Sequence, residues 1–185
     1  MRFIETKLSG AFIIEPELRE DARGFFARTF CTHEFAEHGL ETRFVQCNIS
    51  RSRARGTVRG MHYQLPPAGE AKLLRCTSGA LCDVIIDLRP ESSTYLQHVS
   101  VELSARNLRW LYVPQWFAHG FQTLEDETEV FYQISEFYAP AQATGLRFDD
   151  PALKITWPLT VSVISEKDLA WPLLGSHTAQ PLPKL

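Results

Sequence analysis

The stretch Gly56–Arg75, GTVRGMHYQLPPAGEAKLLR, decides how the rest of the chain is interpreted. Val58–Gln64 alternates in the manner of a strand, the segment PPAG interrupts it, and a second strand begins at Ala71. A hairpin of this kind can aim the imidazole of His62 and the ammonium of Lys72 at one small volume. A surface hairpin with solvated charges fits the same residues, so the stretch alone leaves both interpretations open.

Short apolar strands separated by turn residues recur along the whole chain. A single short helix, His33–His38, is expected, with Thr32 as its cap and Gly39 as its stop. Strands at a spacing of roughly 8–12 residues predict an all-β sandwich or barrel, and a jelly roll is the natural closed form. The other candidate strands are Ala11–Ile14, Phe25–Phe30, Phe44–Ser50, Leu81–Leu88, His98–Leu103, Asn107–Val113, Phe117–Leu124 and Thr128–Ser135.

Length and composition indicate one ordinary globular domain. The chain has 185 residues, a net charge of -3 and a hydrophobic content of 44%. We find no repeat and no linker, so we expect a single domain over residues 1–174 and a flexible C-terminal tail over residues 175–185. The overall charge gives no argument for nucleic acid as a partner. Arginines 51, 53, 55 and 59 form either a solvated strand end or a basic rim for an anionic ligand.

Cysteine spacing and the N-terminus indicate the compartment. No CxxC pair or zinc spacing links the cysteines, which predicts free thiols in a reducing compartment. The first residues, MRFIETKLSG, have no apolar signal core, and no apolar run approaches the ~20 residues of a membrane span. We therefore expect a cytoplasmic protein without a membrane partner. The four cysteines are Cys31, Cys47, Cys76 and Cys82.

The stretch GTVRGMHYQLPPAGEAKLLR resembles the signature of the dTDP-4-dehydrorhamnose 3,5-epimerase family. The likeness continues in order through REDARGFFARTF, FVQCNIS, DVIIDLRPESSTY, VPQWFAHGFQTLEDETEVFYQISEFYAP, DDPALKITWP and SEKD. The resemblance implies a cupin-type double-stranded jelly roll with short flanking helices. It also implies epimerisation, at C3, C5 or both, of a nucleotide-linked 4-keto-6-deoxyhexose of the dTDP-4-dehydro-6-deoxy-D-glucose type, in deoxysugar biosynthesis. No cofactor and no metal are expected.

Epimerisation beside a carbonyl needs a base on one face of the substrate and an acid on the other. It also needs a donor near the oxygen where negative charge develops. An imidazole with an ordinary pKa near ~6.5 suits the base, and the resemblance assigns this role to His62. It places Lys72 beside the enolate oxygen and makes Tyr132 the proton donor. Tyr132 alternates with Val130 and Ile134, so a simple core tyrosine fits the pattern too.

Asp168 has two competing interpretations. Ser165-Glu166-Lys167-Asp168 is similar to a capping box that opens a short C-terminal helix. The resemblance instead makes Asp168 the carboxylate that pairs with His62. The two roles can coexist.

The resemblance also supplies substrate-binding residues. Gln46, Asn48 and Arg59 match positions that hold the nucleotide diphosphate, and His119 and Tyr138 match pocket positions. On a straight strand Arg59 would point away from His62, so both reach one pocket only if Gly60 forms a bulge or the strand twists sharply.

The segment RGFF, with Arg23 and Phe26, matches a family element that crosses to a neighbouring subunit. The implied assembly is a homodimer with exchanged N-terminal strands, built from Ala11–Ile14 and Phe25–Phe30. Arg28 stands where relatives commonly carry glutamate near the nucleobase, which leaves the base of the substrate open. Ala143 and Phe148 likewise stand where glutamate and tryptophan are common.

Two other classes of function fit parts of the sequence. A metal-dependent cupin isomerase or oxygenase requires an HxH pair of metal ligands. This chain reads His62-Tyr63-Gln64, so the second histidine of the pair is missing. A non-catalytic sugar-nucleotide-binding module would need no acid–base pair. The sequence supplies no residue that decides between inversion at C3, at C5 or at both.

Overall fold

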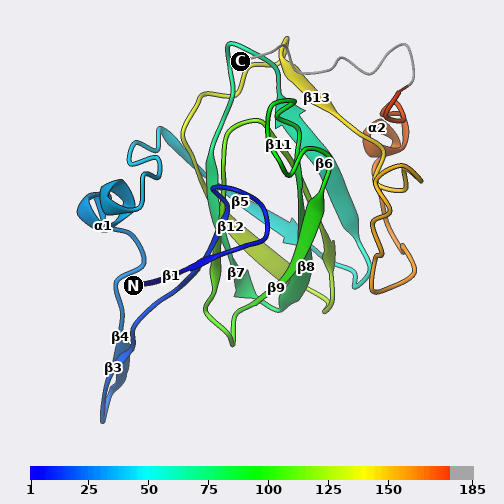
Figure 1. Cartoon of the computed structure of the whole chain (residues 1–185). Coiled ribbons are helices and arrows are strands. Elements are labelled where there is room, and N and C mark those ends of the chain that lie inside the picture. The colour runs from blue at the N-terminus through cyan, green and yellow to red at the C-terminus, as the bar shows by residue number, and fades with distance from the viewer. Residues whose placement is uncertain (176–185) are drawn as a thin grey trace.

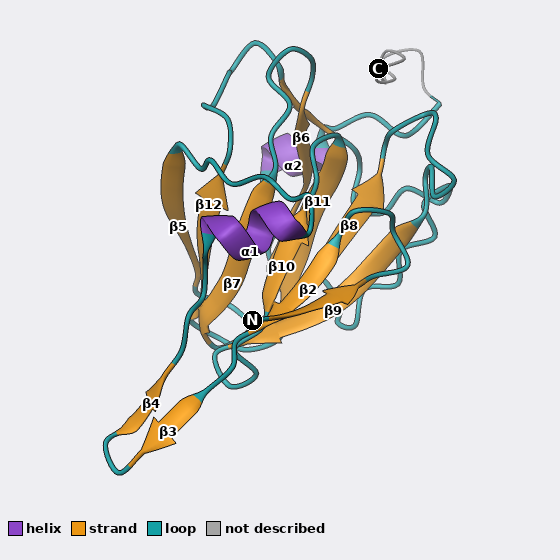
Figure 2. Cartoon of the chain, turned by 60° about the vertical axis from the view of Figure 1, so that its left-hand side comes forward, coloured by secondary structure: helices purple, strands orange, loops and turns teal. Residues whose placement is uncertain are grey.

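The computed structural model describes residues 1–175, and these form two β-sheets packed face to face with one projecting hairpin (Figures 1 and 2). The six-stranded sheet has the order β1 (Arg2–Glu5), β2 (Phe12–Glu15), β10 (Trp110–Val113), β7 (Lys72–Ser78), β12 (Thr128–Ile134) and β5 (Gln46–Ser52). The five-stranded sheet has the order β13 (Ala143–Gly145), β6 (Val58–Gln64), β11 (Phe117–Thr123), β8 (Ala80–Asp87) and β9 (His98–Ser104). All the strand pairs are antiparallel, and the predicted all-β jelly roll is confirmed.

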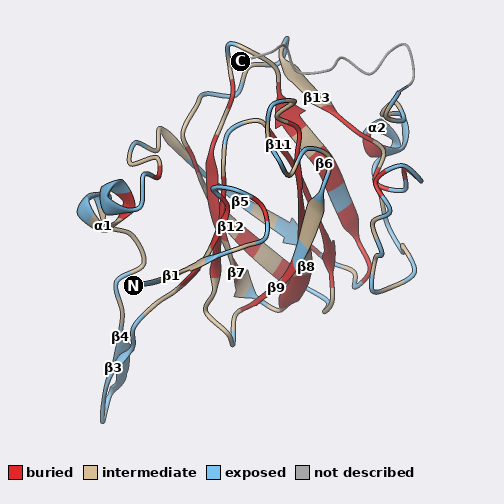
Figure 3. Cartoon of the chain, viewed as in Figure 1, coloured by how far each residue is buried: buried red, intermediate tan, exposed pale blue. Residues whose placement is uncertain are grey.

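The main core lies between the two sheets, where Leu74, Leu81, Ile85, Leu111 and others are fully buried. Figure 3 shows this burial along the inner strands. Two further clusters cover the outer faces. The helix α1 (Thr32–Glu37) packs Phe35 against the outer face of the six-stranded sheet, and the segment around Leu146 and Leu153 covers the other sheet. Tyr132 packs against the main core, so its expected inward direction is confirmed.

The central stretch contains two strands, but it does not form a paired hairpin. β6 has the predicted bounds Val58–Gln64, and it pairs with β11 and β13. β7 belongs to the opposite sheet, where it pairs with β10 and β12. The expectation of a hairpin is therefore wrong, because the connection after Gln64 carries the chain from one sheet to the other. His62 and Lys72 consequently face each other across the sandwich.

The short elements differ from the sequence prediction at their ends. The helix begins at Thr32 with Cys31 as its cap residue and no side-chain cap, so the prediction that Thr32 caps it is wrong. Gly39, at φ +67, follows the helix as expected. Strand β4 (Gly24–Phe26) ends before Phe30, whose ring packs instead against Phe35. Strands β1 and β13 were not predicted, and neither was the strand Arg19–Asp21.

The hairpin of β3 (Arg19–Asp21) and β4 projects away from the two sheets (Figure 2). Phe26, the last residue of β4, is 72% exposed and Phe25 is 55% exposed. Strand β2, in contrast, is paired on both edges, to β1 and to β10 of its own chain. The strand Ala11–Ile14 therefore has no free edge with which to pair with a second subunit. The prediction that this strand is exchanged is wrong.

Two sequence predictions concern the chain ends and membranes. The predicted flexible tail falls almost entirely on residues 176–185, which lie outside the described part of the chain. Within residues 1–175, neither helix has the length and apolar character needed to span a bilayer.

Candidate active site

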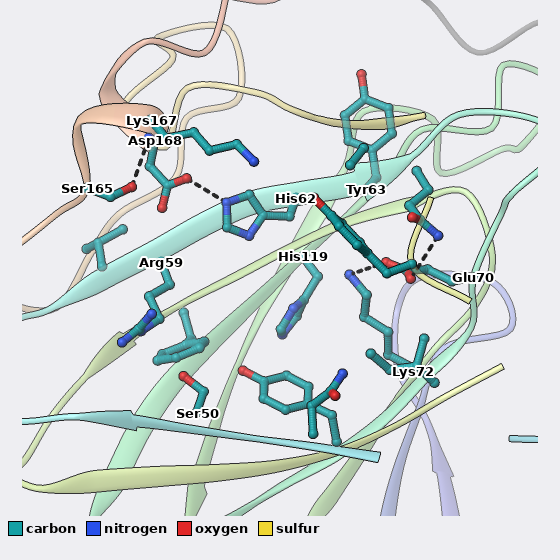
Figure 4. Close-up of a pocket in the computed structure, with 18 of the residues that line it drawn as sticks. Ser50, Arg59, His62, Tyr63, Glu70, Lys72, His119, Ser165, Lys167 and Asp168 are labelled. Atoms are coloured by element: carbon teal, nitrogen blue, oxygen red, sulfur yellow. Dashed lines mark hydrogen bonds and ion pairs between the residues drawn. The ribbon is translucent and has the colours of Figure 1, made fainter. Parts of the chain in front are cut away.

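A pocket of about 800 Å³ opens between the two sheets, and it collects most of the residues that the sequence singled out. β6 and β11 supply one wall, while β5, β7 and β12 supply the facing wall. The C-terminal segment around helix α2 (Glu166–Leu169) closes one side (Figure 4). The expected site residues that line it are Gln46, Asn48, Arg59, His62, Lys72, His119, Tyr132, Tyr138 and Asp168.

His62 and Asp168 form a hydrogen-bonded pair at the pocket wall. His62 Nε2 lies 2.6 Å from Asp168 Oδ1, and the carboxylate is nearly buried while 43% of the His62 side chain is exposed. An ionised carboxylate can only accept, so Nε2 carries the hydrogen and Nδ1 keeps a lone pair. Burial pushes the pKa of Asp168 upward. The hydrogen bond and charge of His62, with donors from Gly60 and Trp171, bring it below its ordinary value.

Asp168 belongs to a capped helix as well. The Ser165 hydroxyl accepts a hydrogen bond from the Asp168 backbone N–H at 3.0 Å, while the Asp168 carboxylate turns to His62. Its second oxygen accepts from the backbone N–H of Gly60 at 3.3 Å. Helix capping by Ser165 therefore positions the carboxylate, and the two sequence interpretations coexist.

Lys72 comes from the opposite sheet and has its own carboxylate. Its Nζ lies 3.0 Å from Glu70 Oε1, and both side chains are close to fully buried. The amide of Gln64 donates to the other oxygen of Glu70 at 3.2 Å and accepts from the backbone N–H of Ala139. Figure 4 shows Lys72 and Glu70 across the pocket from Asp168. Gln64 thus ties the loop that carries Tyr138 to the Lys72 ion pair.

His119 is also held by a carboxylate, at the floor of the pocket. Its Nε2 lies 2.9 Å from Asp83 Oδ2, and the Asp83 side chain is 0% exposed. The other oxygen of Asp83 is buried and has no hydrogen-bond partner in the described part of the chain. Because Nε2 of His119 is already hydrogen-bonded to Asp83, only Nδ1 is available for a hydrogen bond to a ligand.

Tyr132 lies beside His119, with ring centroids 6.2 Å apart in an edge-on arrangement. Burial raises the pKa of the Tyr132 hydroxyl strongly, and the negative charge of Asp83 raises it further, against the opposing effect of Arg59. The hydroxyl therefore keeps its proton at neutral pH and can serve as an acid.

Arg59 reaches the same pocket as His62 because the strand bulges between them. His119 pairs with His62 and Phe121 with Arg59, so three steps along β6 match two along β11. Gly60 adopts φ +138, and a Cβ there would lie 2.5 Å from Gly120 Cα. Of the two predicted alternatives, a bulge at Gly60 and a sharp twist of the strand, the register shows the bulge. Arg59 donates to Ser52 Oγ at 3.1 Å.

The remaining sequence candidates lie elsewhere. Arg23 and Phe26 sit on the projecting hairpin, outside the pocket of their own chain, and Arg23 pairs with Asp21. Arg28 pairs with Glu34 at 2.9 Å, also outside the pocket. Ala143 lines the pocket, whereas Phe148 is buried beside Trp157.

Several residues of the site were missed from the sequence. Asp83 carried a usable signal, because it is an acid in the middle of the apolar run that became β8. Glu70 stands two positions before Lys72, but the ion pair between them was not predicted. Lys167 and Trp171 line the pocket next to Asp168, and nothing local in the sequence marks them. No group of three or more potential metal-ligating side chains occurs among residues 1–175.

Comparisons with known proteins indicate one family. The family model described as dTDP-4-dehydrorhamnose 3,5-epimerase matches residues 5–176. A relative of that name from Methanothermobacter thermautotrophicus is 47% identical over 179 residues, which is 95% of this chain and 96% of the relative.

Solved structures are similar as well. The epimerase from Bacillus anthracis, with TDP and PPi bound, has 42% identity and a TM-score of 0.90, over 94% of this chain and 99% of its own. The enzyme from Legionella pneumophila, in complex with dTDP-4-keto-L-rhamnose, has 38% identity and a TM-score of 0.91, over 100% and 98%. The chain described here belongs to the dTDP-4-dehydrorhamnose 3,5-epimerase family.

Proposed function

We propose that the pocket epimerises a nucleotide-linked 4-keto-6-deoxyhexose, of the dTDP-4-dehydro-6-deoxy-D-glucose type, with His62 as the base and Tyr132 as the acid. Membership of the family makes the protein a sugar-nucleotide epimerase of deoxysugar biosynthesis. The observation that carries the assignment of roles is the His62–Asp168 pair, which shares one pocket with Lys72 and Tyr132.

The first step removes a proton from the carbon next to the keto group. The free lone pair of His62 takes this proton, and the C–H electrons move into an enolate whose negative charge rests on the keto oxygen. Asp168 balances the imidazolium that forms. Lys72 donates a hydrogen bond to the enolate oxygen, in a buried position where such a contact is strong.

The second step returns a proton to the opposite face. The Tyr132 hydroxyl gives its proton to the carbon, and the enolate electrons form the new C–H bond and restore the ketone. The phenolate then regains a proton from solvent, and His62 loses the one that it took. The reaction leaves the enzyme unchanged and needs no redox partner.

The nucleotide part is proposed to lie toward the rim of the pocket. Arg59 is exposed there, and Gln46 and Asn48 stand on β5 in the facing sheet. A guanidinium and two amides suit the oxygens of a diphosphate. Tyr138 is 59% exposed at the rim and offers a flat ring to the sugar or the base.

We further propose a homodimer in which the β3–β4 hairpin reaches the partner's pocket. The hairpin has few contacts with its own chain and exposes Phe25 and Phe26. Strand β5 forms one edge of the six-stranded sheet and is open on its outer side. In this arrangement Arg23 would add a cation to the partner's diphosphate site.

A cytoplasmic location is part of the same proposal. Cys31, Cys47, Cys76 and Cys82 are all free thiols, which suits a reducing compartment.

The decisive experiment is incubation with dTDP-4-keto-6-deoxyglucose in deuterated water, followed by NMR. Deuterium at C3, C5 or both, together with inversion at the same carbons, is the expected result, and it also reports which positions react. Binding without exchange would support the non-catalytic alternative. Exchange that disappears on metal chelation would support the metal-dependent one.

A further inference from the structure

Trp171, two residues beyond α2, lies beside the His62–Asp168 pair. Its indole Nε1 donates a hydrogen bond of 3.2 Å to Asp168 Oδ1, the same oxygen that His62 contacts at 2.6 Å. The other carboxylate oxygen accepts from the backbone of Gly60. The carboxylate is therefore fixed by an imidazole and a main-chain amide from β6 and by an indole from the C-terminal segment.

The indole is wedged against the strands that carry His62. A Cβ at Gly145 would lie 2.7 Å from Trp171 Nε1 and Cε2, so the backbone of β13 contacts the indole directly. Gly145 is the register partner of His62 in the β6–β13 pairing. The rings of Trp171 and His62 are 6.4 Å apart at 71°, and the Lys167 ammonium lies 5.4 Å from the Trp171 ring centroid. The position of the indole N–H is thus set by packing on several sides.

We propose that Trp171 is a positioning residue for the proton-transfer step, which holds Oδ1 of Asp168 in line with Nε2 of His62. A carboxylate on a single-bonded stem can rotate, and rotation would remove the counter-charge from the imidazolium at the moment it forms. The indole N–H blocks this rotation, because Oδ1 can satisfy both donors in only one orientation.

The electrostatics of the carboxylate agree with this geometry. The indole is one of the donors that act together to bring the pKa of Asp168 below its ordinary value, although burial acts in the opposite direction. The carboxylate stays ionised, which is the state that the partner of an imidazolium needs.

The inference rests on the roles proposed above for His62 and Asp168. Its test is the Trp171→Phe variant, which removes the N–H and keeps an aromatic ring. We expect kcat and the rate of deuterium incorporation to fall together by roughly tenfold, the usual scale for one hydrogen bond to a charged group. We expect KM to stay within about twofold, since Trp171 acts on a transfer step and not on binding.

Trp157→Phe is the matched control. The Trp157 indole is also partly buried and donates one hydrogen bond, to the carbonyl oxygen of Phe148 at 2.9 Å, but it does not line the pocket. This variant should keep wild-type kcat. If Trp171→Phe fails to fold, benzothienylalanine at position 171 replaces the N–H by sulfur and preserves the two-ring shape.

A double-mutant cycle with Asp168→Asn separates the proposed role from a purely structural one. If Trp171 acts through Asp168, its replacement should cost almost nothing further in the Asp168→Asn background. An equal loss in both backgrounds, or a folded Trp171→Phe enzyme with wild-type kcat, would overturn the inference. If Asp168→Asn alone leaves kcat unchanged, it is the His62–Asp168 assignment that fails, so the two failures are distinguishable.

Discussion

His62 Nε2 and Asp168 Oδ1 are 2.6 Å apart, although the two residues are separated by 106 positions in the sequence. The contact exists because α2 docks beside β6, with the Ser165 cap directing the first turn of the helix. The C-terminal segment thereby supplies the carboxylate partner of the proposed base, and its small helix contributes to the proposed chemistry as well as to folding.

Replacement of His62 and of Tyr132 should have different consequences. His62→Ala should lose both deuterium exchange and inversion, because no base remains. Tyr132→Phe should retain some exchange, because His62 and Lys72 still permit the enolate to form, but inversion should fall ~10²–10⁴-fold. NMR in deuterated water measures both rates. Inversion at the wild-type rate in Tyr132→Phe would exclude Tyr132 as the acid and make Tyr138 the next candidate.

Asp83→Asn should slow the reaction, because the Asp83 carboxylate fixes the ring of His119 and an amide can present N–H instead of oxygen. We expect kcat to fall about tenfold. Asp87→Asn is a matched control, since Asp87 is also 0% exposed on β8 but bonds Arg89, Ser92 and Thr94 away from the pocket. Thermal unfolding of both variants separates stability from activity. Equal kcat in the two variants would contradict a role for Asp83 at the site.

Gly60→Ala should be far more damaging than Gly39→Ala. Both glycines have positive φ, +138 and +67, but a Cβ at Gly60 would meet the Gly120 backbone at 2.5 Å, while nothing lies within 4 Å of one at Gly39. We expect about 1 kcal/mol of destabilisation for Gly39→Ala and more than about 3 kcal/mol for Gly60→Ala. Urea unfolding measures both. Similar costs would show that the close approach of β6 and β11 is readily relaxed.

The projecting hairpin should govern assembly. Phe25→Ser combined with Phe26→Ser removes the apolar surface of β4 and should convert a dimer into a monomer in light scattering at micromolar concentration. Arg23→Ala should leave the dimer intact and raise KM for the sugar nucleotide several-fold. A monomeric wild-type protein would contradict the proposed assembly, and with it the proposed role of Arg23 in the partner's diphosphate site.

Two cysteines should differ sharply in reactivity. Burial raises the pKa of Cys76 to about 11, and its thiol donates to the carbonyl oxygen of Ser78. At pH 8 the Cys76 thiol is therefore protonated and should resist iodoacetamide, while the exposed Cys47 reacts. Labelling of Cys76 should increase only as the pH rises toward 11. Mass spectrometry of the native protein checks this, and rapid labelling of Cys76 at pH 8 would refute it.

The sequence predicted strands better than it predicted their partners. Val58–Gln64 was located to the residue because alternation and the prolines after it mark both ends. The assignment of this strand and the next to opposite sheets depends on long-range pairing with β11 and β12, which no local pattern encodes. The short strands β1 and β13 have too few residues to show a period.

Prediction of the site residues was limited in the same way, by contacts between distant parts of the chain. The resemblance located His62, Lys72, Tyr132 and Asp168, and the four line one pocket. The carboxylates Glu70 and Asp83 were missed because their partners are defined by tertiary contacts and not by spacing. The tension between Arg59 and His62 was visible in the sequence, but only the register with β11 resolves it.

The pairing of bases with carboxylates means that electric charge varies with depth in the pocket. Lys72, His62 and His119 each have a carboxylate within 3.0 Å, so these three bases leave no unpaired positive charge in the interior. Arg59 and Lys167 have no carboxylate in ion-pair distance among residues 1–175, and both are exposed near the opening. A ligand with an uncharged head and a doubly negative tail would enter in only one orientation, with the head at the bottom. The arrangement of charged side chains in the pocket can thus orient a sugar nucleotide before any specific contact forms.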